Sequence, residues 1–156
     1  MNYSGKLRIL LDSTYLLPIV GVEVEGIDKT LLILRKLRRQ GVLEVYYTPF
    51  NIIEILGKIS KLKYDQRIVL AGLKVIYDEF IQVHPTIEGY IKALELKSRG
   101  FKDLIDLLLY TTSLTRNLLF LTRDYVLINF LQEQGESIGT IIYENDFIKK
   151  FSDIGH

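Results

Sequence analysis

The stretch LRILLDS, residues 7–13, indicates the fold of this chain. A short, mostly aliphatic run ends at Asp12, and its length and content suit a buried strand followed by polar residues that cap a helix. The stretch LLFLTRD, residues 118–124, repeats this plan: an apolar run, and then an aspartate shortly after it. Two such segments predict buried parallel strands that end in carboxylates.

Helical patterns separate these and further strand-like runs along the whole chain. Such alternation favours parallel βαβ units and an open sheet with helices on both faces. We expect a single domain over residues 1–156. The expected strands span residues 7–11, 42–47, 80–83, 118–121 and 139–143, and the expected helices end near residues 20, 40, 62, 79, 99, 117, 134 and 151.

Composition excludes several kinds of chemistry. The chain has 156 residues, 48% of them hydrophobic, with no Cys, two His and a net charge of +1. Disulfides and cysteine–zinc sites are therefore excluded, and a histidine-built metal site or Ser-His-Asp triad is disfavoured. The longest stretch without a charged residue spans residues 13–22, whereas a membrane helix needs about 20 apolar residues. We expect a soluble, cytoplasmic protein with no membrane association.

Two aspartates follow predicted strands. Asp12 ends the first strand, and Asp124 lies just beyond the strand at residues 118–121. In open α/β sheets, ligands bind outside the carboxyl ends of the strands, so both side chains are expected to face one crevice. Each aspartate taken alone could simply cap the helix that follows it.

Further carboxylates lie on predicted helices. Asp106 is surrounded by leucine and isoleucine, where a lone charge is costly unless it is paired or bound to a metal ion. Asp103 shares its face one turn earlier and could be the helix cap. Glu54 begins a polar stripe opposite Ile52, Leu56 and Ile59, which a solvated helix face would also explain.

Strand-end aspartates and helix-borne acids that converge without His or Cys would form a hard oxygen site. Such a site suits Mg²⁺ or Mn²⁺. Ions of this kind activate water and stabilise the charge on an attacked phosphate. Motifs for a glycine-rich phosphate loop are absent from the sequence.

Four segments resemble the PIN domains, small metal-dependent ribonucleases that include the VapC toxins of toxin–antitoxin pairs. The resemblance covers nearly the full chain, with the segments in the family's order. They are ILLDS (9–13), YTPFNIIEI (47–55), DLLLYTTSL (106–114) and LFLTRD (119–124).

This resemblance implies a three-layer α/β/α sandwich with a central parallel sheet of about five strands. It also implies a catalytic, metal-binding set of acids, namely Asp12, Glu54, Asp106 and Asp124. Ser13 and Thr122 would be polar helpers near the metal. Asp103 leaves the third acidic position open between itself and Asp106, and Leu107 stands where the family often has a small residue.

Basic residues near these motifs are candidates for contact with RNA phosphates. They are Lys58, Lys61, Lys102 and Arg123. A solvated face is the alternative explanation for them. Stacking aromatics are not evident, which fits recognition of the backbone rather than of bases.

The sequence thus favours an Mg²⁺- or Mn²⁺-dependent endoribonuclease, either the toxin of a type II toxin–antitoxin pair or a PIN-like module that processes or binds RNA. A receiver-type phosphoacceptor domain is a weaker alternative, because Asp12 has no acidic neighbour and residues 139–143 contain no lysine. Expected partners are RNA, an antitoxin protein and a second copy of the chain. The homodimer is expected because 48% hydrophobic residues and a mean hydropathy of +0.17 are high for an 18.1 kDa monomer.

Overall fold

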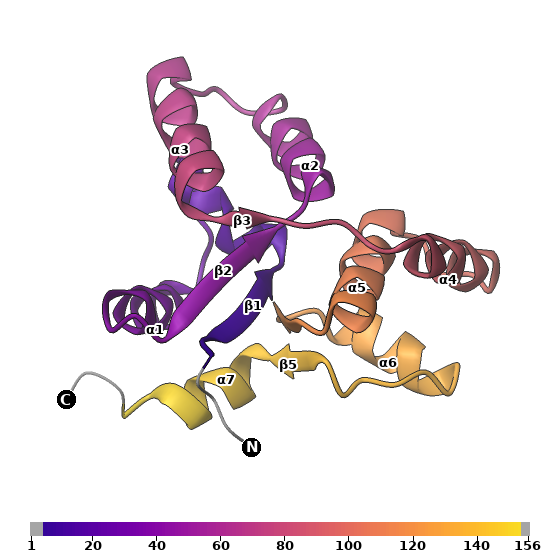
Figure 1. Cartoon of the computed structure of the whole chain (residues 1–156). Helices are drawn as coiled ribbons and strands as arrows, with labels where there is room; N and C mark the ends of the chain where they lie inside the picture. Colours follow the sequence, from indigo (N-terminus) through magenta and orange to yellow (C-terminus); the bar gives the residue numbers. More distant parts are fainter. Residues whose placement is uncertain (1–4, 154–156) are drawn as a thin grey trace.

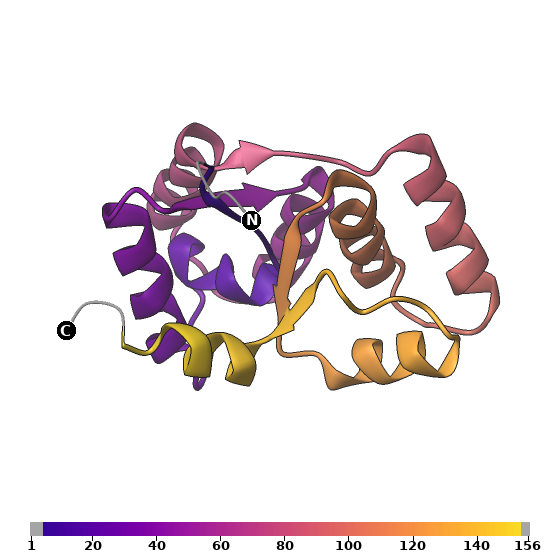
Figure 2. The same cartoon turned by 60° about the horizontal axis from the view of Figure 1, so that its bottom comes forward.

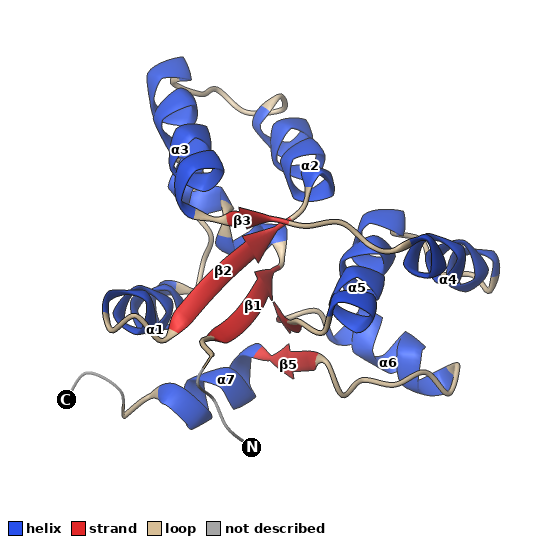
Figure 3. Cartoon of the chain, in the orientation of Figure 1, coloured by secondary structure: helices blue, strands red, loops and turns tan. Residues whose placement is uncertain are grey.

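The computed structural model describes residues 5–153, and its centre is a parallel sheet (Figures 1 and 3). Within these residues the sheet has five strands in the order β3-β2-β1-β4-β5, and every adjacent pair is parallel. The strands are β1 (Leu7–Leu11), β2 (Leu43–Tyr47), β3 (Ile81–Gln82), β4 (Leu119–Thr122) and β5 (Ile141–Tyr143).

Helices connect the strands, as parallel pairing requires. The α-helices of the described residues are α1 (Asp28–Arg39), α2 (Pro49–Ile59), α3 (Gln66–Glu79), α4 (Ile87–Ser98), α5 (Leu104–Arg116), α6 (Tyr125–Glu133) and α7 (Glu144–Phe151). Within residues 5–153 none of them is long and apolar enough to cross a membrane.

The two faces of the sheet bury separate apolar cores. Ile9 and Leu11 of β1 pack with side chains of α1 and α7, whereas Leu10 packs with those of α5 and α6. This alternation follows from the two-residue period of a strand. Figure 2 shows α1 and α7 on one side of the sheet and α4, α5 and α6 on the other. The three-layer α/β/α fold predicted from the sequence is confirmed.

The segment after β1 differs from the predicted helix. Two short 3₁₀ turns, η1 (Ser13–Tyr15) and η2 (Leu17–Val20), replace it. Pro18 lies in the first turn of η2 and has no N–H to donate, which prevents one continuous helix. Gly21 then ends the segment with a φ of 90°, a conformation that glycine adopts without strain.

The strand order places a topological switch point between β1 and β4. From β1 the chain proceeds to β2 on one side, and from β4 to β5 on the other. Ligands of open α/β sheets bind at such a point, outside the carboxyl ends of the strands. Asp12 directly follows β1, and Asp124 follows β4 by two residues.

Candidate metal centre

Asp12 is a buried carboxylate at the end of β1. Its Oδ2 accepts a hydrogen bond of 2.8 Å from Thr122 Oγ1, and its Oδ1 accepts one of 3.4 Å from the Thr14 N–H. The pKa of Asp12 is raised to about 6, mainly by burial and to a smaller extent by the charges of Glu54 and Asp124, against the hydrogen bonds from Thr122 and Thr14 that lower it. The site therefore holds a carboxylate whose negative charge is poorly compensated by the protein.

Asp106 lies in the first turn of α5, and its pKa is raised further above the ordinary value than that of Asp12. Burial is the main cause that raises its pKa to about 9, followed by the charges of Asp12 and Asp103. A hydrogen bond with Asp124 also favours its protonated form. Residues 107–113, which follow it, are all buried, so the prediction of a largely buried helix is confirmed for them.

Asp103 has two roles in the structure. It is the cap of α5, where its Oδ1 accepts hydrogen bonds from the N–H groups of Ile105 (3.0 Å) and Asp106 (3.2 Å). It also joins Glu54 and Asp106 in a group of carboxylates, each with an oxygen within 4.8 Å of the others. The structure thus brings both candidates for the third acidic position together. We call the acids at this place, Asp12, Glu54, Asp103, Asp106 and Asp124, the acidic crevice.

Asp124 is the cap of α6. Its Oδ1 accepts hydrogen bonds from the N–H groups of Val126 (3.0 Å) and Leu127 (3.2 Å), and its own N–H donates to Thr122 Oγ1. Thr122 therefore connects Asp124 to Asp12 through one hydroxyl group. Helix capping and membership of the acidic crevice, which the sequence offered as alternatives, coexist at Asp124.

The donor set fits a hard divalent cation. Every acid of the crevice offers carboxylate oxygens, which Mg²⁺ and Mn²⁺ prefer. Without a cation these acids repel one another, and this repulsion adds to burial, the main cause, in raising the pKa values of Asp12 and Asp106. A bound cation would remove that repulsion.

Asn51 positions the helix that carries Glu54, and sequence reasoning missed it. This buried amide donates from Nδ2 to the Leu11 carbonyl (3.2 Å) and to Ser13 Oγ (2.9 Å). Its Oδ1 accepts from the N–H of Thr48 (2.7 Å), and its own N–H donates to Thr48 Oγ1 (3.1 Å). The capping box between Thr48 and Asn51 fixes the start of α2, and the two hydrogen bonds from Nδ2 hold that start against Leu11 at the end of β1 and against Ser13. The sequence TPFN at 48–51 carried the signal, with Asn in place of the usual Glu or Gln.

The predicted apolar stripe of α2 is wrong in one position. Ile55 and Ile59 are buried, whereas Leu56, which was expected to be in the stripe, is exposed, and Ile52 is half-buried. Asn51 occupies the buried face one turn before Ile55. The expected stripe was placed by apolar residues alone, and the buried face of α2 instead begins with the polar residue Asn51.

The predicted phosphate contacts divide into two groups. Lys58, Lys61 and Lys102 are exposed. Arg123 instead makes contacts within the protein: its guanidinium donates to the carbonyls of Glu25 (3.0 Å) and Gly26 (3.3 Å) and forms an ion pair of 2.9 Å with Glu144. Of the four candidates, the three lysines are exposed, whereas Arg123 is half-buried and held by these contacts.

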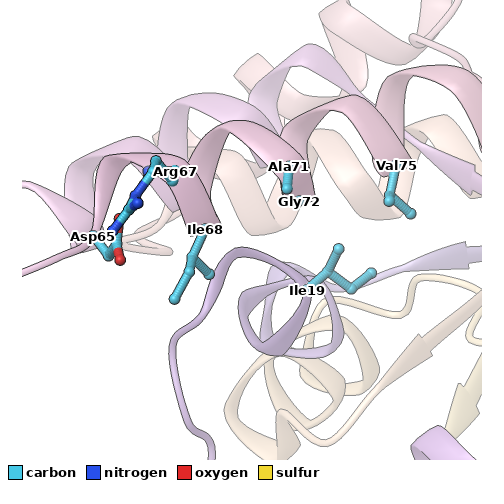
Figure 4. Close-up of a pocket in the computed structure, with 7 residues that line it drawn as sticks. All are labelled: Ile19, Asp65, Arg67, Ile68, Ala71, Gly72 and Val75. Carbon is cyan, nitrogen blue, oxygen red and sulfur yellow. The ribbon is translucent and has the colours of Figure 1, made fainter.

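A separate hollow lies between η2 and α3 (Figure 4). Its volume is about 440 Å³, and Gly72 lines it where α3 approaches the Ile19 carbonyl so closely that a Cβ would overlap it. Its charged residues, Asp65 and Arg67, face each other at 3.6 Å. The hollow gathers no set of repelling acids, so we place the chemistry at the carboxylate crevice instead.

The fold and the acids at its switch point define this chain as an α/β/α protein of the PIN-like fold. The structure of VapBC2 from Rickettsia felis, bound to a DNA fragment from the promoter of VapBC2, is similar to this chain with a TM-score of 0.59 and 15% sequence identity. The match covers 88% of this chain and 98% of that one. PAE2754 from Pyrobaculum aerophilum matches with a TM-score of 0.55 and 16% identity, over 96% and 94%. FitAcB from Neisseria gonorrhoeae matches with a TM-score of 0.56 and 14% identity, over 89% and 98%.

These likenesses establish the fold, in agreement with the resemblance stated from the sequence. No family model matches the chain, and no curated protein matches it in sequence.

Proposed function

We propose that this protein is a metal-dependent endoribonuclease and the toxin of a toxin–antitoxin pair. The observation that carries the proposal is the crevice at the switch point, where Glu54, Asp103 and Asp106 lie within 4.8 Å of one another and Asp12 and Asp124 adjoin them. The likeness to VapBC2 and FitAcB supports the toxin assignment through the shared fold.

The acids would hold Mg²⁺ or Mn²⁺. When bound there, the ion supplies an activated water and stabilises charge on the attacked phosphate. Glu54, Asp103 and Asp106 offer the closest group of oxygens, and Thr122 orients Asp12 toward them. Lys58, Lys61 and Lys102 attract RNA phosphates to a crevice that would otherwise repel them.

RNA cleavage is expected to depend entirely on a divalent cation. Purified protein incubated with an unstructured RNA should cleave it with Mg²⁺ or Mn²⁺, and excess EDTA should stop the reaction, because the acids alone repel phosphate. Gel analysis of a labelled RNA measures this. The variant Asp12→Asn, shown to be folded by its circular dichroism spectrum, is the control for a contaminating nuclease. Undiminished cleavage in EDTA contradicts the proposal, and metal binding without cleavage favours an RNA-binding module instead.

Two exposed apolar surfaces, one on α4 and one on α3, are candidate binding sites for protein partners. On α4 the side chains of Ile87, Ile91 and Leu94 are exposed at helical spacing, and on α3 those of Leu70 and Tyr77 are exposed. Monomeric proteins rarely expose contiguous apolar patches of this kind. We include an antitoxin protein and a second copy of the chain among the partners.

The chain without other proteins is expected to be at least a dimer at tens of micromolar. Sedimentation equilibrium measures its mass, and paired variants locate the contact. Leu70→Lys with Tyr77→Lys alters α3, and Ile91→Lys with Leu94→Lys alters α4. One of these pairs should give a folded monomer, because two lysines cannot be desolvated cheaply in an interface. A monomeric unaltered chain would exclude the homodimer.

A further inference from the structure

Glu144 is a buried carboxylate outside the acidic crevice. It is the first residue of α7, and its side chain is 6% exposed. Its Oε1 accepts the hydrogen bond of 2.9 Å from Arg123 Nη2, while its Oε2 has no hydrogen-bond partner among residues 5–153. A buried charge of this kind is retained only where its charge partner is held closely.

In the sequence, Arg123 lies between two residues that belong to the crevice or contact it. Thr122 before it bonds Asp12, and Asp124 after it belongs to the acids. The Arg123 guanidinium donates to the carbonyls of Glu25 and Gly26 and to the carboxylate of Glu144, and none of these groups belongs to the acids of the crevice. Arg123 directly precedes Asp124, and the charges of both Arg123 and Asp12 act on the hydroxyl of buried Tyr15. The guanidinium therefore lies near the acids, and a released arginine side chain would be drawn toward them.

A released arginine would compete with a metal ion. The crevice gathers at least three carboxylate oxygens within 4.8 Å, and a guanidinium binds carboxylates through two parallel hydrogen bonds. Tyr15 is buried beside Glu144, and its pKa is raised first by its own burial and then by that carboxylate, so Glu144 adjoins the buried core. Among residues 5–153, the carboxylate that forms an ion pair with this guanidinium is that of Glu144.

We propose that Glu144 is a positioning residue that neutralises Arg123 and holds its guanidinium away from the acidic crevice, so that the crevice stays open to a divalent cation. The inference rests on the proposed function, since it concerns the metal affinity of the same site. It assigns to Arg123 a place in the support of the crevice instead of a contact with RNA.

Two variants of the full chain test this assignment. Glu144→Gln keeps the shape but removes the charge that holds Arg123, and Arg123→Met with Glu144→Gln removes both charges. Isothermal titration calorimetry with Mn²⁺ should show about tenfold weaker binding for Glu144→Gln, because the freed guanidinium competes for the acids. The double variant should bind Mn²⁺ within about threefold of the unaltered chain, since the competitor is gone.

RNA kinetics add a measurement that a purely structural role would not move. Glu144→Gln should lower kcat at a fixed Mn²⁺ concentration, and excess Mn²⁺ should restore it. The double variant should keep the KM for RNA of the unaltered chain. A raised KM in the double variant would return Arg123 to the phosphate contacts and overturn the inference. A double variant that binds Mn²⁺ no better than Glu144→Gln overturns it too.

Glu144→Asp provides the test if Glu144→Gln does not fold. It keeps a negative charge beside Arg123, so Mn²⁺ binding should stay within about threefold of the unaltered chain even if stability falls. Tenfold weaker binding by a folded Glu144→Asp would contradict the inference. Failure of the unaltered chain to bind Mn²⁺ contradicts the proposed function, whereas unchanged affinity in Glu144→Gln contradicts this inference alone.

Discussion

Replacing Asp106 by asparagine is expected to abolish RNA cleavage and, at the same time, to stabilise the metal-free protein. Cleavage should fall at least about a hundredfold, since even residues that support metal ligands cost 10–100-fold when they are changed. Stability should rise because burial and the neighbouring acids hold the pKa of Asp106 at about 9, so that folding at neutral pH must protonate it. Asparagine has a similar shape and no proton to take up.

The size of the gain follows from the pKa. Each pH unit between the ordinary value of 3.8 and the working pH costs about 1.4 kcal/mol, which at pH 7 amounts to a cost on the order of 3 kcal/mol after allowance for partial exposure. The melting temperature in EDTA should therefore rise by roughly 6–12 °C for a chain of this length. Added Mn²⁺ should stabilise Asp106→Asn less than the unaltered chain.

Asp103→Asn is the matched comparison on the same helix. Asp103 uses Oδ1 to cap α5, and asparagine caps a helix about as well as aspartate, so this replacement should change stability by less than about 1 kcal/mol. Much of the activity should remain, because Asp106 and Glu54 still offer carboxylate oxygens to the cation. Calorimetry in EDTA and RNA cleavage at matched folding measure both variants. An inactive Asp103→Asn beside an active Asp106→Asn would move the third acidic position by one helical turn.

The fold could be predicted because its signals are local and repeated. Aliphatic runs such as residues 7–11 alternate with helical patterns, and most of the α-helices start at a recognisable cap, such as Thr48 before Pro49, whereas α1 and α7 start without one. The alternation leaves few topologies open, since parallel strands need crossover connections. Element ends moved by only a few residues, and the failure at η1 and η2 came from Pro18 in a short segment.

The acids of the crevice were predictable for a similar reason, because strand ends and an apolar helix mark them. Their partners were not. Asn51 and Glu144 are polar residues on surfaces that the chain buries, and burial depends on which elements pack there. Arg123 was predicted to contact phosphate because it lies next to Asp124 in the sequence. Its ion pair with Glu144 depends on where α7 packs, which the sequence does not show.

The metal-free protein is expected to lose stability as the pH rises from 6 to 8. Both Asp12, with a pKa of about 6, and Asp106, with a pKa of about 9, titrate above their ordinary value of 3.8. The folded state thus binds more protons than the unfolded state between 3.8 and each raised pKa, so stability falls with pH in that window. From pH 6 to 8 the proton of Asp106 dominates, since Asp12 has largely ionised.

One proton taken up on folding changes the free energy of unfolding by about 1.4 kcal/mol per pH unit. The melting temperature in EDTA should therefore fall by roughly 5–10 °C from pH 6 to 8. Asp106→Asn should nearly abolish this fall, which assigns the fall to the carboxyl group of Asp106. Saturating Mn²⁺ should reverse the slope, because a bound cation favours the ionised acids and its binding releases their protons. A flat profile in EDTA, or the same fall in Asp106→Asn, would show that the acids of the crevice are not held together against their own repulsion.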